Sequence, residues 1–278
     1  MVVFTGSLKT AKSIHNNLSN KSGKIVPLIA ETSGLNTMII DSSALLERAC
    51  DDVMRSAFNS AGQRCSALRL LLVHQEVYSE FVSMLKGAIK DLTIGMPNDL
   101  GTDIGPIITF DAMKKLNNYL AKMKADGHSL FQASTHNVPP DGSWVLPTLI
   151  ELELSSMPNE EKFGPILHIA SFSEDTLVDS LKQIEAKGFA LTFGIHTRID
   201  STAINVAKQT SCGNIYINRD IVGAVVETQP FGGKNLSGSG FKAGGPNYLL
   251  QFMDERVIAV NTVAIGGNID LINLNNDN

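Results

Sequence analysis

Segments patterned like buried strands alternate with segments patterned like amphipathic helices along most of this chain. Such alternation is typical of α/β proteins, in which helices cover a mostly parallel sheet. The chain is therefore predicted to have an α/β fold. Strands are predicted at residues 2–6, 23–31, 36–41, 67–74, 145–152, 166–172, 191–197 and 212–218. Helices are predicted at residues 8–20, 43–62, 76–92, 110–127, 174–188 and 200–210.

Two of the predicted helices carry signals at their ends. Ser7 precedes the first helix, and either Ser42 or Ser43 stands at the start of the second. A serine hydroxyl at this position accepts a hydrogen bond from a free backbone N–H, so these serines are predicted to be N-caps. Gly62 is predicted to end the second helix, because glycine readily adopts the left-handed conformation of a C-terminal cap.

The composition excludes several classes of protein. The chain has 278 residues, 43% of them hydrophobic and 18% charged, with a net charge of −5. An acidic chain without a basic cluster is not expected to bind nucleic acid or an anionic membrane surface. No apolar run reaches the roughly 20 residues of a transmembrane helix, and the start "MVVFTGSLKTAK" lacks the features of a signal peptide. We therefore expect a cytoplasmic location.

The three cysteines, Cys50, Cys65 and Cys212, form no CxxC motif and no Cys/His pair. This argues against a disulfide framework or a zinc site, and no metal is expected. Cys50 lies at helical spacing from apolar neighbours and Cys212 opens a predicted strand, so both are interpreted as packing residues. Cys65 follows a glycine and adjoins Arg64. It is either a buried thiol or a nucleophile, and its local sequence leaves both open.

Two acidic segments have a similar ambiguity. Glu31 ends an apolar strand and is followed by small residues, so it is either a solvated strand end or a base directed into a cleft. In "NEEKFGPIL", Glu160, Glu161 and Phe163 precede a Gly-Pro turn. This segment is either a charged turn with one anchoring aromatic or part of a binding site.

Residues 231–247, "FGGKNLSGSGFKAGGPN", are rich in glycine. Such a segment can be a disordered linker. Here aromatic and basic residues alternate with the glycines, and apolar segments flank them. We therefore predict a structured loop or a lid over a site.

Five of these motifs stand in a distinctive order. They are "FTGS" at 4–7, "AETSG" at 30–34, "GQRCSA" at 62–67, "EEKFGP" at 160–165, and "PFGG" with "SGSG" at 230–240. This order resembles that of the aldehyde dehydrogenase superfamily over nearly the whole chain. The segments "INRDIVGAVVETQPFGG" and "SGFKAGGPNYL" most resemble the glutamate-semialdehyde (1-pyrroline-5-carboxylate) dehydrogenases, and in particular that module of bifunctional proline utilization A.

The resemblance implies catalytic roles for two residues. Cys65 would be the nucleophile that attacks the aldehyde carbon and forms a thiohemiacetal. Hydride transfer to NAD would leave a thioester, and Glu31 would activate the water that hydrolyses it. The interpretation of Cys65 as a nucleophile thus comes from the set of motifs and not from its local sequence.

The resemblance also implies that NAD is the cofactor. Ser7 would lie near the pyrophosphate, Glu161 on the nicotinamide ribose and Phe163 against the nicotinamide ring. These residue types suit the roles, since a hydroxyl can bind phosphate, a carboxylate accepts from ribose hydroxyls and an apolar ring packs on a flat one. FAD is expected only in a proline dehydrogenase module of the parent protein, if there is one.

The substrate-binding roles implied by the resemblance fall on Arg64, Ser66, Gly223, Ala224 and Phe231. A substrate with an α-carboxylate needs anion donors, and a Gly-Ala pair offers unhindered backbone N–H groups. Structural alternatives remain, because Ser66 can cap a turn and Phe231 can belong to the core.

The sequence departs from the family in three ways. The first Rossmann half is expected before residue 1, with the asparagine of the oxyanion hole and the lysine that binds the adenosine ribose. Loss of one oxyanion donor typically costs about 10²–10³ in rate, so this chain is interpreted as an incomplete C-terminal portion with little activity alone. Ser33 replaces a glycine and would be strained at positive φ. Lys162 replaces an apolar or small residue.

We expect a remnant of the NAD-binding domain at 1–30, a catalytic domain at 31–217, and a glycine-rich substrate loop with the C-terminal tail at 218–278. The expected partners are a small-molecule aldehyde and a second copy in a homodimer. The expected function is the NAD-dependent oxidation of L-glutamate γ-semialdehyde to L-glutamate. The alternatives are a catalytically incompetent fragment or partner-binding module, and a dehydrogenase for another semialdehyde.

Overall fold

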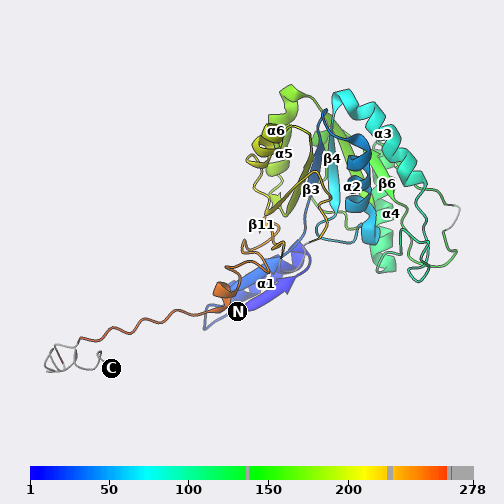
Figure 1. The fold of residues 1–278 in the computed structure, drawn as a ribbon. Coiled ribbons are helices and arrows are strands. Elements are labelled where there is room, and N and C mark those ends of the chain that lie inside the picture. The colour runs from blue at the N-terminus through cyan, green and yellow to red at the C-terminus, as the bar shows by residue number, and fades with distance from the viewer. Residues whose placement is uncertain (136–137, 224–227, 262–263, 265–278) are drawn as a thin grey trace.

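The computed structural model in Figure 1 describes residues 1–135, 138–223, 228–261 and 264. Its centre is a seven-stranded sheet with the order β10-β9-β3-β4-β7-β6-β5. All neighbouring strands are parallel except β5 and β6, which are antiparallel. The predicted α/β fold is therefore confirmed. In the order of the sheet, the strands span Asn214–Ile217, Thr192–His196, Asn36–Ile40, Leu68–His74, Ile166–Phe172, Thr148–Glu151 and Ser129–Gln132.

The middle of this sheet is the core of the molecule. Every residue of β3 and β4 is buried, as is typical of parallel strands with helices on both faces. Helices α2 and α3 cover one face, and α5 and α6 cover the other (Figure 1). Helix α4 precedes the edge strand β5. The helices span Leu46–Phe58 (α2), Gln75–Lys90 (α3), Phe110–Ala125 (α4), Leu177–Glu185 (α5) and Asp200–Ala207 (α6).

A second, smaller unit lies beside one end of the large sheet (Figure 1). It consists of the parallel strands β1 (Val2–Thr5) and β2 (Leu28–Glu31), with helix α1 (Leu8–Asn20) between them in the chain. This unit is thin: Val3 is 53% exposed and Ala11 is the one buried residue of α1.

The glycine-rich segment joins the two units. On one side, the N–H of Thr32 donates to the carbonyl of Ser237, and the N–H of Ser239 donates to Ala30, each at 2.9 Å. On the other side, β11 (Lys234–Asn235) pairs with β8 (Phe189–Ala190), which precedes β9. These backbone bonds confirm the predicted structured loop and exclude the disordered linker for this segment.

The predicted cap of helix α2 was wrong. The helix begins at Leu46, and its N-cap position is Leu45, which makes no side-chain cap bond. The Ser43 hydroxyl instead donates to the carboxylate of Asp41 at 2.5 Å. A short polar side chain after a strand can bond its neighbours in the loop, and this bond keeps Ser43 away from the helix. Neither Ser43 nor Ser42 is the cap.

The predicted end of helix α2 at Gly62 was also wrong, because the helix ends at Phe58. Ser60, Ala61 and Gly62 all have positive φ, which no right-handed helix accommodates. The first helix matches its prediction, because the Ser7 hydroxyl accepts from the N–H of Thr10 at 3.2 Å.

The described part of the C-terminal segment leaves the body of the molecule as an extended chain (Figure 1). Residues 253–261 form no helix or strand, and Val257 and Ile258 are exposed. Among the described residues, none of the helices combines the length and the apolar character that crossing a bilayer requires.

Candidate active site

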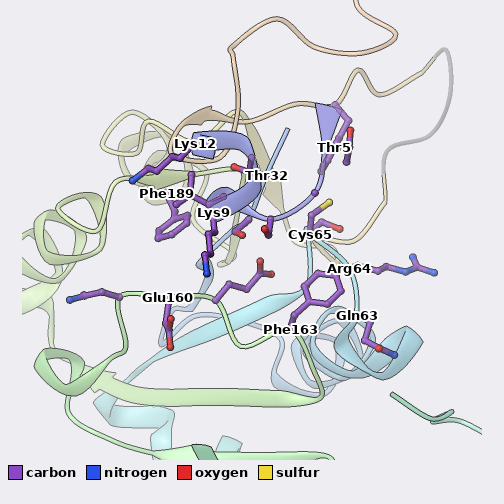
Figure 2. Close-up of a pocket in the computed structure, with 18 of the residues that line it drawn as sticks. Thr5, Lys9, Lys12, Thr32, Gln63, Arg64, Cys65, Glu160, Phe163 and Phe189 are labelled. Carbon is purple, nitrogen blue, oxygen red and sulfur yellow. The ribbon is translucent and has the colours of Figure 1, made fainter. Parts of the chain in front are cut away.

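A cavity of about 1120 Å³ lies between the two sheets. Thr5 and Thr32, at the carboxyl ends of β1 and β2, line one side. The segments that precede β4 and β7 line the opposite side of the cavity, so the amino ends of these strands of the large sheet face it. Figure 2 shows Lys9, Cys65 and Phe163 around this cavity, each from a different segment.

Left-handed backbone places Cys65 at the cavity. Ser60, Ala61 and Gly62 have φ values of 56°, 53° and 64°. Two of these residues carry a Cβ atom, and each such residue in this region stores about 1–2 kcal/mol of strain. Gly62 packs directly against the carbonyl oxygen of Gly164, where a Cβ atom would clash. The turn therefore presses the cysteine segment against the turn before β7.

Asn36 fixes the backbone around Cys65. Its amide nitrogen donates to the carbonyl oxygens of Cys65 and Ala67, at 2.7 and 2.8 Å. Its amide oxygen accepts from the N–H of Thr192 at 3.1 Å. Asn36 is buried, so a lost bond here leaves an unsatisfied polar group. Its network joins the starts of β3, β4 and β9 to the cysteine segment.

Cys65 itself is half-buried. Burial raises the pKa of its thiol above the ordinary value, and the charge of Glu161 raises that pKa further. The backbone N–H groups of Ser66 and Cys65 act in the opposite direction, and Glu31 adds a smaller upward effect. The free thiol is thus predominantly protonated at neutral pH.

Glu31 does not line the cavity in this structure. Its carboxylate accepts from the backbone N–H of Gly233 at 2.8 Å and packs against Gly238, where a Cβ atom would lie 2.7 Å from it. The glycines of this segment therefore let the chain approach the carboxylate closely. Glu31 is still close enough to Cys65 to influence the pKa of its thiol.

The environment of Glu31 suits a general base. Burial raises its pKa to about 7, and this is the largest effect on it. The N–H of Gly233 and the charge of Lys242 lower that pKa in part. A carboxylate that titrates near neutral pH can take a proton from water and release it again. Lys242 also donates to the carbonyl of Gly232 at 2.8 Å, which secures the segment around Glu31.

Glu161 lies deep in the site. The Arg69 guanidinium binds its Oε1 atom from Nε at 3.2 Å and from Nη2 at 2.9 Å. Burial raises the pKa of Glu161, while Arg69, the N–H of Gly34 and the hydroxyl of Ser33 lower it. Ser33 is free of positive φ, so the expected strain at this position is absent.

The residues predicted to hold NAD fit a dinucleotide. Ser7 caps a helix of 13 residues, and its free N–H groups and partial positive charge suit a phosphate. Lys9 and Lys12 line the same cavity and add positive charge. Phe163 also lines it and is 44% exposed, which leaves an apolar ring available to a flat ligand group.

The predicted substrate residues are brought together in part. Arg64, Ser66, Gly223 and Phe231 all line the cavity, and Gly223 has a φ of 100° that favours glycine. Ala224 lies outside the described residues. Arg64 is exposed, and its Nε atom donates to the hydroxyl of Ser60 at 3.0 Å.

Two residues that the sequence interpretation did not single out organise the site. They are Arg69 and Asn36, and both stand inside or at the start of apolar strands. An arginine within "ALRLLLVH" was a signal, because a charged side chain in a buried strand needs a partner. Its partner, Glu161, lies 92 positions away in the chain, and no local pattern links the two residues.

Similarity to known proteins identifies the family. Residues 1–258 match the sequence profile described as "Aldehyde dehydrogenase family". The chain belongs to this family. The predicted superfamily is therefore confirmed.

Named relatives narrow the resemblance. Over 263 residues the chain is 45% identical to "Bifunctional protein PutA" of Salmonella typhimurium, covering 92% of this chain and 20% of that protein. It is 32% identical to "1-pyrroline-5-carboxylate dehydrogenase" of Bacillus subtilis, covering 92% of this chain and 50% of that protein. The chain thus spans a fifth to a half of the length of these relatives.

Solved structures of the same two kinds of protein superpose on this chain. A crystal structure of bifunctional proline utilization A (PutA) superposes with a TM-score of 0.88 at 47% identity, covering 95% of this chain and 26% of that one. A 1-pyrroline-5-carboxylate dehydrogenase from Thermus with bound NAD superposes with a TM-score of 0.81 at 27% identity, covering 91% and 49%. The predicted resemblance to the PutA dehydrogenase module is confirmed.

Proposed function

We propose that this chain carries the nucleophile and the base of an NAD-dependent dehydrogenase that oxidises L-glutamate γ-semialdehyde to L-glutamate. The relatives named for PutA and for 1-pyrroline-5-carboxylate dehydrogenase support this substrate class. The observation that carries the proposal is the cavity that brings together Cys65, Phe163 and Ser7 from three distant segments.

The chemistry begins at Cys65. Its sulfur attacks the aldehyde carbon, the C=O π bond opens as the sulfur–carbon bond forms, and the thiol proton ends on the former carbonyl oxygen, which gives a thiohemiacetal. The N–H groups of Cys65 and Ser66, which lower the pKa of the thiol, stabilise negative charge at this point. When bound, NAD would supply the acceptor for a hydride from this carbon, and with the hydroxyl proton released to water a thioester would remain on Cys65.

Glu31 acts in the second half of the reaction. Its carboxylate takes a proton from a water molecule, which attacks the thioester carbon and displaces the Cys65 thiolate. The product is a carboxylic acid, and the nucleophile is regenerated. For this step Glu31 has to turn from its bond with Gly233 toward the cavity, and the pKa of about 7 permits the proton transfer at neutral pH.

The cofactor and substrate roles belong to the same proposal. Ser7 binds the pyrophosphate, Glu161 the nicotinamide ribose, and Phe163 packs on the nicotinamide ring. Arg64, Ser66, Gly223, Ala224 and Phe231 hold the semialdehyde, with its α-carboxylate on backbone N–H groups near Gly223.

The wider organisation is also proposed. Residues 1–30 belong to the cofactor domain, 31–217 to the catalytic domain and 218–278 to the substrate loop and tail. The chain works as a homodimer in the cytoplasm, and FAD is involved only where a longer parent protein has a proline dehydrogenase module.

The test is the reduction of NAD with glutamate semialdehyde. It is run with this chain and with the longest product that its gene encodes, and each carries Cys65→Ser as the control. Activity in the longer product that disappears with Cys65→Ser supports the proposal. Absence of turnover in the longer product contradicts it and favours a partner-binding module. Turnover with another semialdehyde alone would correct the substrate.

A further inference from the structure

Arg69 is the largest fully buried side chain of the described residues, with 1% of its surface exposed. It lies on β4, a few residues after Cys65 in the chain. A buried guanidinium is costly unless its donors find acceptors. All three nitrogen atoms of Arg69 donate, and Nε and Nη2 bind the Glu161 carboxylate. Nη1 donates to the carbonyl of Gly164 at 3.0 Å, and Nη2 also donates to the carbonyl of Arg64 at 3.1 Å.

The same guanidinium contacts both candidate cofactor residues of the segment before β7. Nε and Nη2 donate to the Glu161 carboxylate, and the ion pair is buried on both sides. The guanidinium carbon also lies 5.6 Å from the centre of the Phe163 ring. Arg69 therefore joins the cysteine segment, through Arg64, to the groups that face the nicotinamide half of a dinucleotide.

The backbone of Arg69 is itself held in place. The Nδ1 atom of His168 bonds its carbonyl at 2.8 Å, and the hydroxyl of Tyr119 bonds Nε2 at 2.7 Å. Since a carbonyl only accepts, Nδ1 carries the proton and Nε2 accepts from Tyr119. Burial lowers the pKa of His168 to about 4, so this neutral form persists at neutral pH.

Ser33 completes the surroundings of the carboxylate. Ser33 and Glu161 line the same cavity, and the Ser33 hydroxyl and the N–H of Gly34, in the loop between β2 and β3, act as donors that lower the pKa of the Glu161 carboxylate. Ser33 stands two residues after Glu31. A glycine at this position lacks the hydroxyl, so this donor is a property of the serine.

We propose that Arg69 is a positioning residue that orients Glu161 toward the nicotinamide ribose and aligns it with Cys65, and that the Ser33 hydroxyl assists it. The inference rests on the proposed function for the role of Glu161. Arginine suits this task because its planar fork reaches the carboxylate and two carbonyls at once. Lysine keeps the charge but has no such fork.

The test compares two nucleotides on the longest product of the gene. NAD reaches the nicotinamide-ribose site, whereas ADP shares only the adenosine diphosphate part. In Arg69→Lys we expect the Kd for NAD, measured by calorimetry, to rise about 10- to 100-fold, the effect of lost charged hydrogen bonds. The Kd for ADP should stay within about twofold, below the effect of one lost bond.

Two further variants make the comparison decisive. Leu71→Ala is the matched control, because Leu71 is a buried residue of the same strand that does not line the cavity. It lowers the melting temperature and should leave both Kd values unchanged. Ser33→Gly should raise the Kd for NAD about 3- to 10-fold, because one neutral hydrogen-bond donor is lost, and should leave the Kd for ADP unchanged. Where Arg69→Lys does not fold, Ser33→Gly still tests whether the donors around the Glu161 carboxylate control the affinity for NAD.

Equal weakening of NAD and ADP in Arg69→Lys, or no change in either, would overturn the inference and make Arg69 a purely structural residue. An unchanged NAD affinity in Ser33→Gly would overturn the part of the inference that concerns Ser33. A wild-type protein that binds no NAD would overturn both this inference and the proposed function. Selective weakening of NAD in a protein that fails to oxidise glutamate semialdehyde would leave the inference standing and refute only the proposed function.

Discussion

The two sheets that meet at the cavity are supported very differently. Strands β3 and β4 of the large sheet are buried along their whole length. In the small unit, β1 alternates between half-buried and exposed residues, and its Val3 is 53% exposed. Cys65, the proposed nucleophile, thus precedes a strand of a thick, packed body, whereas Ser7 belongs to a thin layer.

Because of this difference, we expect substitutions in the large sheet and in the small unit to have different effects. Changes within the large sheet should reduce stability first, because its side chains are closely packed on both faces. Changes in the small unit should leave the free energy of unfolding nearly intact and act on ligand binding. A group in direct contact with substrate is the exception on either side, and it should affect activity with no loss of stability.

The largest expected effect is that of Cys65→Ser. We expect the rate of aldehyde oxidation to fall by about 10⁴-fold or more, because the replaced atom forms the covalent bond. The melting temperature should be unchanged, since Cys65 is half-buried in a loop. Cys212→Ser is the matched control, as Cys212 does not line the cavity. A Cys65→Ser protein with near-normal turnover would show that another group is the nucleophile.

The next effect compares Leu72→Ala in the large sheet with Val3→Ala in the small one. Leu72 is fully buried, so its truncation should cost about 2–5 kcal/mol of unfolding free energy. Val3 is 53% exposed, and its truncation should cost less than about 0.5 kcal/mol. Urea unfolding of this chain measures both. Equal losses would break the comparison between a packed and a thin unit.

The pH dependence of hydrolysis tests the contact between Glu31 and the glycine-rich segment. The pKa of Glu31 is about 7 and only its carboxylate accepts a proton, so the rate should fall about tenfold per pH unit below pH 7. Lys242→Met removes a charge that lowers this pKa and should move the midpoint to higher pH. Stopped-flow assays of thioester hydrolysis across pH give both midpoints. An identical midpoint in the two proteins would show that Lys242 does not lower the pKa of Glu31.

The smallest expected effect is that of Ser7→Ala. Loss of the cap bond to Thr10 should cost about 1 kcal/mol of local stability in α1. Amide hydrogen exchange should report this as faster exchange in the first turn of α1, with β3 and β4 unchanged. Faster exchange in the large sheet as well would mean that the two units unfold together.

Long elements with a clear period were predictable from the sequence, and short or weakly apolar ones were not. Strand β5 is exposed at both ends and pairs only at the edge of the sheet, so it has no apolar alternation. Strands β8 and β11 are two residues long. Their pairing depends on the position of the glycine-rich segment, which is set by long-range contacts.

Candidate site residues could be proposed where a motif lies on one segment. Cys65, Phe163 and Ser7 were named as candidates in this way, the family resemblance supplied their proposed roles, and the structure places all three at one cavity. Two features depended on tertiary structure. The partner of Arg69 is distant in sequence, and the orientation of Glu31 toward Gly233 is set by a segment about 200 residues away.

The location of the cavity shows a further limit of the sequence. Ligand sites are expected at the carboxyl ends of parallel strands, and this holds for Thr5 on β1 and Thr32 after β2. On the large sheet the site lies at the amino ends instead, because Cys65 precedes β4. No local pattern indicates which end of a sheet faces a second unit.

The central claim is that Cys65 forms the acyl intermediate and Glu31 releases it. The most direct measurement is a rapid-mixing assay of Glu31→Gln in the longest product of the gene, with NAD and glutamate semialdehyde, followed by mass spectrometry. The account predicts a burst of about one NADH per active site and a glutamyl group on Cys65, because acylation proceeds and hydrolysis stalls. Steady turnover without a burst, or an acyl group on any other residue, would contradict it.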